Sequence, residues 1–168
     1  VRVVDLESGV IDTFAGTGEA SHDGDGGEAR AAGVFGARAV VCRVDDDGVY
    51  VMERQGSCLR LIDSSGVRIE TVASTGETGY GGDGGPVAAV IFDRPKEMTL
   101  DGDGNVLVVD TENHVIRLID FQSDQVSTIA GTGASGFSGV GLIEVLALIH
   151  IGHGRRAHAI REHLRGGC

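Results

Sequence analysis

Residues 95–120 read PKEMTLDGDGNVLVVDTENHVIRLID, in which short aliphatic runs are separated by Asp and Gly. Together with the residues that follow, this stretch predicts strands, because the runs are short and have no 3.6-residue apolar stripe. The expected strands are Lys96 to Leu100, Val106 to Val109, His114 to Ile119 and Val126 to Ala130. The link DGDGN between the first two contains residues that tolerate positive φ in tight hairpin turns. The stretch therefore predicts a four-stranded antiparallel meander.

The same pattern recurs along the chain at intervals of 58 and 57 residues. The segment IDTFAGTGEASHDGDGG at 11–27 aligns with IETVASTGETGYGGDGG at 69–85 and with VSTIAGTGASGFSG at 126–139. An Arg followed by two aliphatic residues and an Asp recurs at the same intervals, at Arg2, Arg60 and Arg117. Meanders repeated at this spacing are typical of propeller blades, because neighbouring blades bury the faces that a single meander leaves exposed.

We therefore expect an all-β chain: a propeller-like array of four-stranded antiparallel meanders, incomplete at about two and a half blades, with an irregular C-terminal tail. Residues 1–139 would hold the array, with a half blade at 1–15 and blades at about 39–73 and 95–130. Closed propellers typically have 4 to 8 blades. An open array exposes strand edges and inter-blade faces, so we expect the chain to be part of a larger propeller and to self-associate when alone.

Residues 140–168 leave the repeat and are basic and His-rich. Three interpretations stay open: a shifted or truncated coding frame with no selected structure, a basic amphipathic helix that contacts a partner, and a cap over the last blade. The tail histidines lack the Cys or carboxylate partners of a tetrahedral zinc site, so they predict no metal site. They are His150, His153, His158 and His163.

Residues 95–120 resemble an NHL repeat, a family named for the Asn-His-Leu triplet that Asn113-His114-Val115 nearly reproduces. The segment GGDGGP at 81–86 resembles the loops between blades in bacterial members of the family. The preceding copy departs from the pattern, with Ala39 in place of Pro and Gly56-Ser57 in place of Asn-His. The resemblance implies a β-propeller whose loops bind a protein, peptide or carbohydrate, and it suggests an extracellular or periplasmic location.

Composition limits the partners further. The chain has 168 residues, 28 of them Gly, and a formal net charge of −11 from 14 Lys and Arg against 25 Asp and Glu. This charge repels phosphate backbones and anionic membrane surfaces, which argues against a nucleic-acid partner. The longest apolar stretch, residues 142–151, is too short to span a bilayer. Cys42 and Cys58 are expected as thiols buried in strands, and Cys168 as a free thiol.

The Asp- and Gly-rich loops supply the candidate ion-binding residues Asp23, Asp25 and Asp83. Their carboxylates and the neighbouring carbonyl oxygens are ligands that suit Ca²⁺. Asp and Gly also build tight crossings between blades, which is the structural alternative. Because the loops occur in each repeat, we expect the structural role, with no bound cofactor and with Ca²⁺ as the alternative.

Arg60 and Arg117 recur at one position among aliphatic residues. Pairing with a carboxylate such as Glu53 or Asp110 is therefore expected, with ligand contact as the alternative. The sequence contains no P-loop, HExxH or G-x-S-x-G motif. We therefore expect a non-catalytic interaction scaffold. Two alternatives stay open, a fragment of a divalent-metal-dependent propeller enzyme of the lactonase-like or lyase-like kind, and a non-functional truncated gene product.

Overall fold

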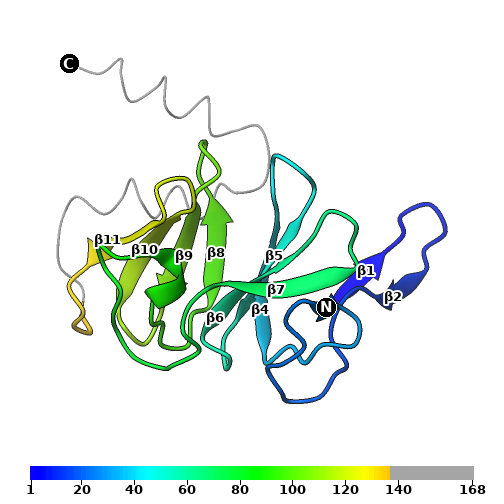
Figure 1. Ribbon diagram of the computed structural model, residues 1–168, viewed down its shortest axis with the longest axis horizontal. Coiled ribbons are helices and arrows are strands. Elements are labelled where there is room, and N and C mark those ends of the chain that lie inside the picture. Colours follow the sequence, from blue (N-terminus) through cyan, green and yellow to red (C-terminus); the bar gives the residue numbers. More distant parts are fainter. Residues whose placement is uncertain (137–168) are drawn as a thin grey trace.

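The computed structural model describes residues 1–136, which form strands with almost no helix (Figure 1). Within this range the strands make three antiparallel sheets, and none of the sheets closes into a barrel. The one short helix described is a 3-10 turn, η1 (Val87–Ala89). The expectation of an all-β chain is confirmed for this range. The three interpretations of the tail concern residues outside it.

The sheet nearest the C-terminus is the predicted four-stranded meander, with the order β11-β10-β9-β8. Its strands differ from the predicted ones by no more than one residue at either end: β8 (Glu97–Leu100), β9 (Val106–Asp110), β10 (Val115–Asp120) and β11 (Gln125–Gly131). The β8–β9 turn is closed by Asp101, whose carboxylate accepts hydrogen bonds from the N–H groups of Asp103 and Asn105, each at 2.9 Å. Gly104 supplies the positive φ, 86°, that this turn requires.

The preceding sheet has the same meander and one additional strand, in the order β3-β7-β6-β5-β4. Its strands are β3 (Gly27–Glu28), β4 (Ala37–Cys42), β5 (Val49–Glu53), β6 (Cys58–Ile62) and β7 (Arg68–Ala73). The short β3 comes from the Asp/Gly loop and was not predicted. Both sheets carry a bulge at the same place, immediately before Arg60 in one and Arg117 in the other.

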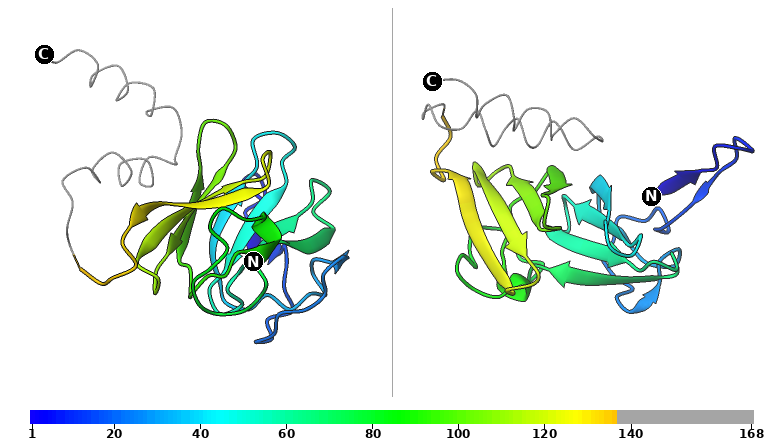
Figure 2. Two further views of the ribbon diagram at one scale, coloured as in Figure 1. Left: turned by 60° about the vertical axis from the view of Figure 1, so that its left-hand side comes forward. Right: turned by 90° about the horizontal axis from the view of Figure 1, so that it is seen from above.

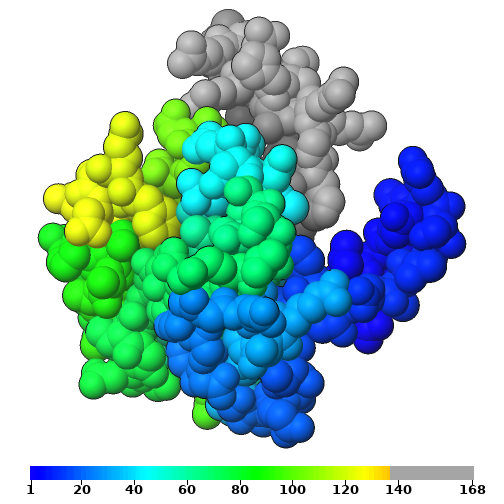
Figure 3. Space-filling view, turned by 45° about the vertical axis from the view of Figure 1, so that its right-hand side comes forward, coloured from blue at the N-terminus to red at the C-terminus, as the bar shows by residue number. Residues whose placement is uncertain are grey.

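The N-terminal residues form a separate hairpin of β1 (Arg2–Val4) and β2 (Ile11–Thr13), which projects from the body of the molecule (Figure 3). Its apolar side chains are exposed, among them Val10 at 59% and Ile11 at 57%. Within the described residues β1 pairs with β2 alone. Its other edge therefore has free backbone hydrogen-bonding groups in this part of the chain.

The two larger sheets, which we call the first sheet (β3–β7) and the second sheet (β8–β11), lie side by side (Figure 2), and β4 of the first contacts β8 of the second. Between them lies the larger apolar cluster, to which the β4–β7 sheet contributes Tyr50, Met52 and Leu59. A smaller cluster packs the other face of the β4–β7 sheet against the segment that precedes it, through Val51 and Ile62 among others. The β4–β7 sheet is thus covered on both faces.

The two clusters are built from corresponding positions of the repeat. Val51, Ile62 and Ile69 of the smaller cluster correspond to Val108, Ile119 and Val126 of the larger one, each 57 residues further along the chain. Each sheet therefore turns the same face toward the segment that precedes it in the chain. No helix of the described residues is long and apolar enough to cross a membrane.

Candidate functional site

Two fully buried arginines occupy the same position in the two larger sheets, Arg60 in what we call the first repeat and Arg117 in the second. Arg60 lies in β6 and Arg117 in β10, and both side chains are 0% exposed. A guanidinium removed from water needs carboxylate and hydrogen-bond partners, because its desolvation is costly. The partners of each arginine come from the neighbouring strand and from the Asp/Gly loop that precedes the sheet.

Arg117 ties the loop at residues 79–86 to its sheet. Its Nη2 lies 3.0 Å from Asp83 Oδ1 and donates to the carbonyl oxygen of Gly81 at 2.8 Å. Its Nη1 lies 3.5 Å from Oδ2 of the buried Asp110 on β9. The guanidinium carbon also lies 5.0 Å from the centre of the Tyr80 ring, a cation–π distance.

The two carboxylates beside Arg117 differ in environment. Burial raises the pKa of Asp110, although its carboxylate accepts hydrogen bonds from Asn113 and from the N–H of Asp93, both at 2.8 Å. Burial would also raise the pKa of Asp83, but hydrogen bonds from Tyr80 and Thr128 and the charge of Arg117 outweigh it and leave this pKa lowered. Asp83 is therefore held as the anion, which suits an ion pair.

Arg60 makes the corresponding contacts in the first sheet. Its Nη1 donates to Glu53 Oε1 at 2.9 Å and to the carbonyl oxygen of Gly33 at 3.2 Å. Its Nη2 lies 2.8 Å from Asp25 Oδ1 and donates to the carbonyl oxygen of Asp23 at 3.1 Å. Asp25 and Asp83 are thus equivalent residues that fasten equivalent loops. The expected pairing of both arginines with Glu53 and Asp110 is confirmed.

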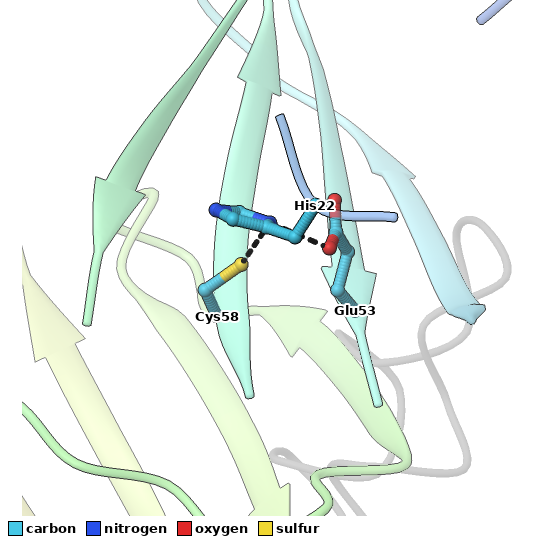
Figure 4. A group of neighbouring side chains, drawn as sticks. All are labelled: His22, Glu53 and Cys58. Atoms are coloured by element: carbon cyan, nitrogen blue, oxygen red, sulfur yellow. Dashed lines mark hydrogen bonds and ion pairs between the residues drawn. The ribbon is translucent and has the colours of Figure 1, made fainter. Parts of the chain in front are cut away.

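Three positions around Arg60 carry different side chains from those around Arg117. His22 replaces Tyr80, Glu53 replaces Asp110, and Cys58 replaces Val115. These three residues of the first repeat meet at one point (Figure 4). His22 Nδ1 lies 2.8 Å from Glu53 Oε2 and 3.5 Å from Cys58 Sγ, and the three donor atoms all lie within 4.8 Å of one another.

The cluster of His22, Glu53 and Cys58 combines one accessible and two buried side chains. The His22 side chain is 30% exposed, whereas Glu53 and Cys58 are 0% exposed. Burial, with a smaller effect of the Glu53 carboxylate, raises the pKa of the Cys58 thiol. Without a bound cation this thiol is therefore protonated at neutral pH. Imidazole, carboxylate and thiol groups together are the ligand set of a transition-metal or zinc site.

The remaining candidate residues have structural partners. The carboxylate of Asp23 accepts a hydrogen bond of 2.7 Å from the N–H of Gly33, which lowers its pKa. Ca²⁺ binding by Asp23, Asp25 and Asp83 stays a prediction. Cys58 is buried as expected, but the prediction for Cys42 is wrong: this thiol is exposed, because it points to the same face of β4 as the exposed residues Arg38 and Val40. Cys168 lies outside the described residues.

The sequence reasoning missed His22. The histidines considered for a metal site, His150, His153, His158 and His163, lie outside the described residues, whereas His22 lies beside two other ligating side chains. Glu53 and Cys58 are 31 and 36 residues from His22 in sequence, so no short motif joins them. The available signal was the repeat itself, because His22 and Cys58 occupy positions where the next repeat has Tyr80 and Val115.

A hollow of about 250 Å³ opens between the two large sheets. Near it, Tyr50 and Phe121 stack with ring centres 5.7 Å apart. The turns between β4 and β5 and between β8 and β9 supply a polar rim that includes Arg43, Asp103 and Asn105. The lining of the hollow is mostly polar, and Tyr50, Leu100 and Phe121 contribute to its apolar part.

Fold and site together define a class: all-β chains of antiparallel meanders in which a buried Arg–carboxylate pair is repeated. No family model matches the chain. The chain is similar to the protein SUPPRESSOR OF QUENCHING 1, chloroplastic, of Arabidopsis thaliana, with 39% identity over 69 residues. The match covers 40% of this chain and 6% of that protein, so the chain corresponds to a small part of this relative.

Two solved structures from Bacteroides thetaiotaomicron are also similar. A protein of unknown function has a TM-score of 0.57 at 19% identity, over 78% of this chain and 30% of that chain. An auxiliary nutrient binding protein has a TM-score of 0.47 at 19% identity, over 64% of this chain and 28% of that chain. At this level of identity the first similarity is one of fold alone.

Proposed function

We propose that this chain is a set of NHL-like blades of a β-propeller and acts as a non-catalytic interaction scaffold. Its sheets would stack on further repeats, and its turns would present a surface to a protein, peptide or carbohydrate ligand. The observation that carries the proposal is that the two apolar clusters are built from equivalent positions of the repeat. The second sheet covers one face of the first sheet, but the same face of the second sheet has no apolar cluster among the described residues. This face is therefore suited to bind another repeat.

The face in question belongs to the β8–β11 sheet. Tyr50, Met52 and Leu59 of the first sheet pack against the second sheet. Their counterparts Leu107, Val109 and Ile116 belong to neither apolar cluster of the described residues; Val109 and Ile116 are half-buried, and Leu107 is buried. Leu118 pairs directly with Leu107, and Leu118 and Ile129 correspond to Leu61 and Val72, which pack on this face of the first sheet. When the chain is alone, we expect a second copy to occupy this face.

The hollow between the sheets supports a ligand-binding role. It lies beside the turns of both repeats, so substitutions in the turns would change the lining of the hollow without changing the strands. Carboxylate, amide and guanidinium groups on the rim offer both donors and acceptors, as the hydroxyl groups of a carbohydrate or the backbone of a peptide require.

Light scattering on the full chain tests the stacking proposal. We expect a mass above the 17.4 kDa of the monomer. Leu118→Glu should return the chain to a monomer, because a charge at an apolar interface is costly to bury. Val10→Glu, on the projecting hairpin, is the matched control and should leave the mass unchanged.

Ile116→Lys provides a second charge on the same face, and circular dichroism checks that each variant is folded. A wild-type chain that stays monomeric at high concentration would overturn the proposal. So would folded Leu118 and Ile116 variants that associate as the wild type does.

A further inference from the structure

We propose that His22, Glu53 and Cys58 form a zinc-binding site, with a water molecule as the fourth ligand. This inference is independent of the proposed scaffold function. It rests on three ligating side chains that converge at one end of the first sheet, and on the second sheet, which keeps a carboxylate at the equivalent point but has Tyr80 and Val115 in place of the imidazole and thiol.

The sulfur–nitrogen distance of the cluster already fits a tetrahedral zinc ion, whereas the nitrogen–oxygen distance is too short. Zn–S and Zn–N bonds of about 2.3 and 2.05 Å at a tetrahedral angle place sulfur and nitrogen about 3.6 Å apart. Cys58 Sγ lies 3.5 Å from His22 Nδ1. The 2.8 Å separation of His22 Nδ1 and Glu53 Oε2 is a hydrogen-bond distance, and it must open by about 0.6 Å when both atoms bind the ion.

The backbone holds two of the ligands in place without the metal. Glu53 ends β5 and Cys58 begins β6, and the two are direct cross-strand partners in the antiparallel register. Directly paired residues point to the same face of a sheet, so the carboxylate and thiol share one side. His22 reaches this side from the Asp/Gly loop (Figure 4). Its partly exposed ring offers a route from solvent to the two buried ligands.

Arg60 orients the carboxylate and need not exclude the cation. Its Nη1 donates to Glu53 Oε1 at 2.9 Å and lies 3.4 Å from His22 Nδ1. Glu53 Oε2 faces His22 and also accepts a hydrogen bond of 3.1 Å from the N–H of Phe35, which leaves its second lone pair for an ion. A hydrogen bond of this kind to a ligating carboxylate is a common support of metal sites. Zinc binding would convert the Cys58 thiol to a thiolate and release one proton. The carboxylates of Glu53 and Asp25 and this thiolate then carry three negative charges, which balance Arg60 and Zn²⁺.

The second repeat shows which features the fold needs without a metal. It keeps the buried arginine, the carboxylate on the neighbouring strand and the aspartate of the loop, as Arg117, Asp110 and Asp83. It has Tyr80 and Val115 where the first repeat has His22 and Cys58. The Arg–carboxylate pair is therefore structural in both repeats, and the imidazole and thiol are additions confined to one.

Cobalt absorption spectroscopy on the full chain tests the site, because a thiolate bound to Co²⁺ gives a charge-transfer band. Cys42→Ser and Cys168→Ser together leave Cys58 as the single thiol, so any such band comes from Cys58. We expect the band to appear with one equivalent of Co²⁺ and to disappear when Zn²⁺ is added, since zinc and cobalt take the same tetrahedral ligands.

Cys58→Val and His22→Tyr, both in the single-thiol background, are the diagnostic variants. Each introduces the residue that the second repeat carries at the same position, so each is compatible with the fold. The first should abolish the band, and the second should weaken Co²⁺ binding at least tenfold. Zn²⁺ should also raise the melting temperature of the single-thiol chain but not of these variants, because an ion bound to the native state stabilises it.

The tail histidines provide the internal control, because they remain in every variant and give no thiolate band. The absence of a band from the single-thiol chain would overturn the proposal. A band that His22→Tyr leaves at full strength, with the same affinity, would exclude His22 as a ligand and overturn the site as proposed.

Discussion

Gly56 leaves the space that the carboxylate of Glu53 occupies, since a Cβ atom on Gly56 would clash with Glu53 Oε2. In the second sheet the corresponding residues are Asn113 and the shorter Asp110, and Asn113 Nδ2 donates to Asp110 Oδ2 at 2.8 Å. The loss of the Asn side chain thus accompanies the longer carboxylate. Both arrangements direct an anion toward the buried arginine.

This relationship predicts that the two positions are coupled. Gly56→Asn alone should clash with Glu53, and Glu53→Asp alone should leave Arg60 without its close partner, each lowering the free energy of unfolding by about 1–3 kcal/mol. The double variant reproduces the second repeat, so its loss should be smaller than the sum by about 0.5–3 kcal/mol. Urea denaturation of the four proteins measures the coupling, and additive losses would contradict it.

Arg117→Met should be among the most damaging single substitutions in the described part of the chain. It leaves Asp110 buried without its ion-pair partner, which costs about 3–5 kcal/mol in comparable buried pairs. Asp83→Asn removes the other ion pair, but the Asp83 side chain is 34% exposed and solvent screens it, so we expect a loss of no more than about 1 kcal/mol. Urea denaturation measures the free energy of unfolding of both variants. Equal losses would contradict the expectation that the buried ion pair contributes more to stability than the partly exposed one.

The strands could be predicted because their determinants are local. The β8–β9 turn is specified by Asp101 and Gly104, whose hydrogen bonds and positive φ need only neighbouring residues. The pairing of the buried arginines was predictable for a different reason, since a buried charge needs a carboxylate and the repeat places one on the adjacent strand. Because the repeat occurs twice, two separate stretches of sequence predicted the same contact.

The features that escaped prediction depend on contacts distant in sequence. β3 exists because Gly27 pairs with Ile69, a partner that no local pattern specifies. Cys42 was expected to be buried from its aliphatic neighbours, but the burial of a strand end depends on which segment covers it. His22 escaped for the same reason, because its function as a candidate ligand depends on a loop that folds back onto β5 and β6.

Gly82 and Gly84 predict different costs for the same substitution. Both have positive φ, 88° and 74°, so Ala at either position adds backbone strain of about 1–2 kcal/mol. A Cβ atom on Gly82 would in addition lie 2.6 Å from Val90 Cα, whereas nothing lies within 4 Å of one on Gly84. We expect Gly82→Ala to lower the melting temperature clearly more than Gly84→Ala. Equal melting temperatures for Gly82→Ala and Gly84→Ala would contradict the close approach of Gly82 to Val90, which directly follows η1.

Acid should destabilise the fold through aspartates that recur at one turn position, Asp5, Asp63 and Asp120. Hydrogen bonds from Ser side chains and backbone N–H groups lower the pKa of each, with the backbone N–H of Ser8 first for Asp5 and the hydroxyl groups of Ser65 and Ser123 first for the other two. Because each pKa is lower in the folded chain than in the unfolded one, the unfolded chain binds more protons at acidic pH. The stabilisation is therefore complete above about pH 5 and is lost as the pH falls below about 4.

Urea denaturation between pH 2 and pH 7 measures this loss. The double variant Asp63→Asn and Asp120→Asn keeps an acceptor oxygen at both turns but cannot titrate, so its stability should fall less steeply with acid. Asp110 opposes the trend, because its raised pKa makes its protonation favour the folded state as the pH falls through that pKa. If the free energy of unfolding rose between pH 5 and pH 3, the buried carboxylate and not the turn aspartates would dominate the acid response.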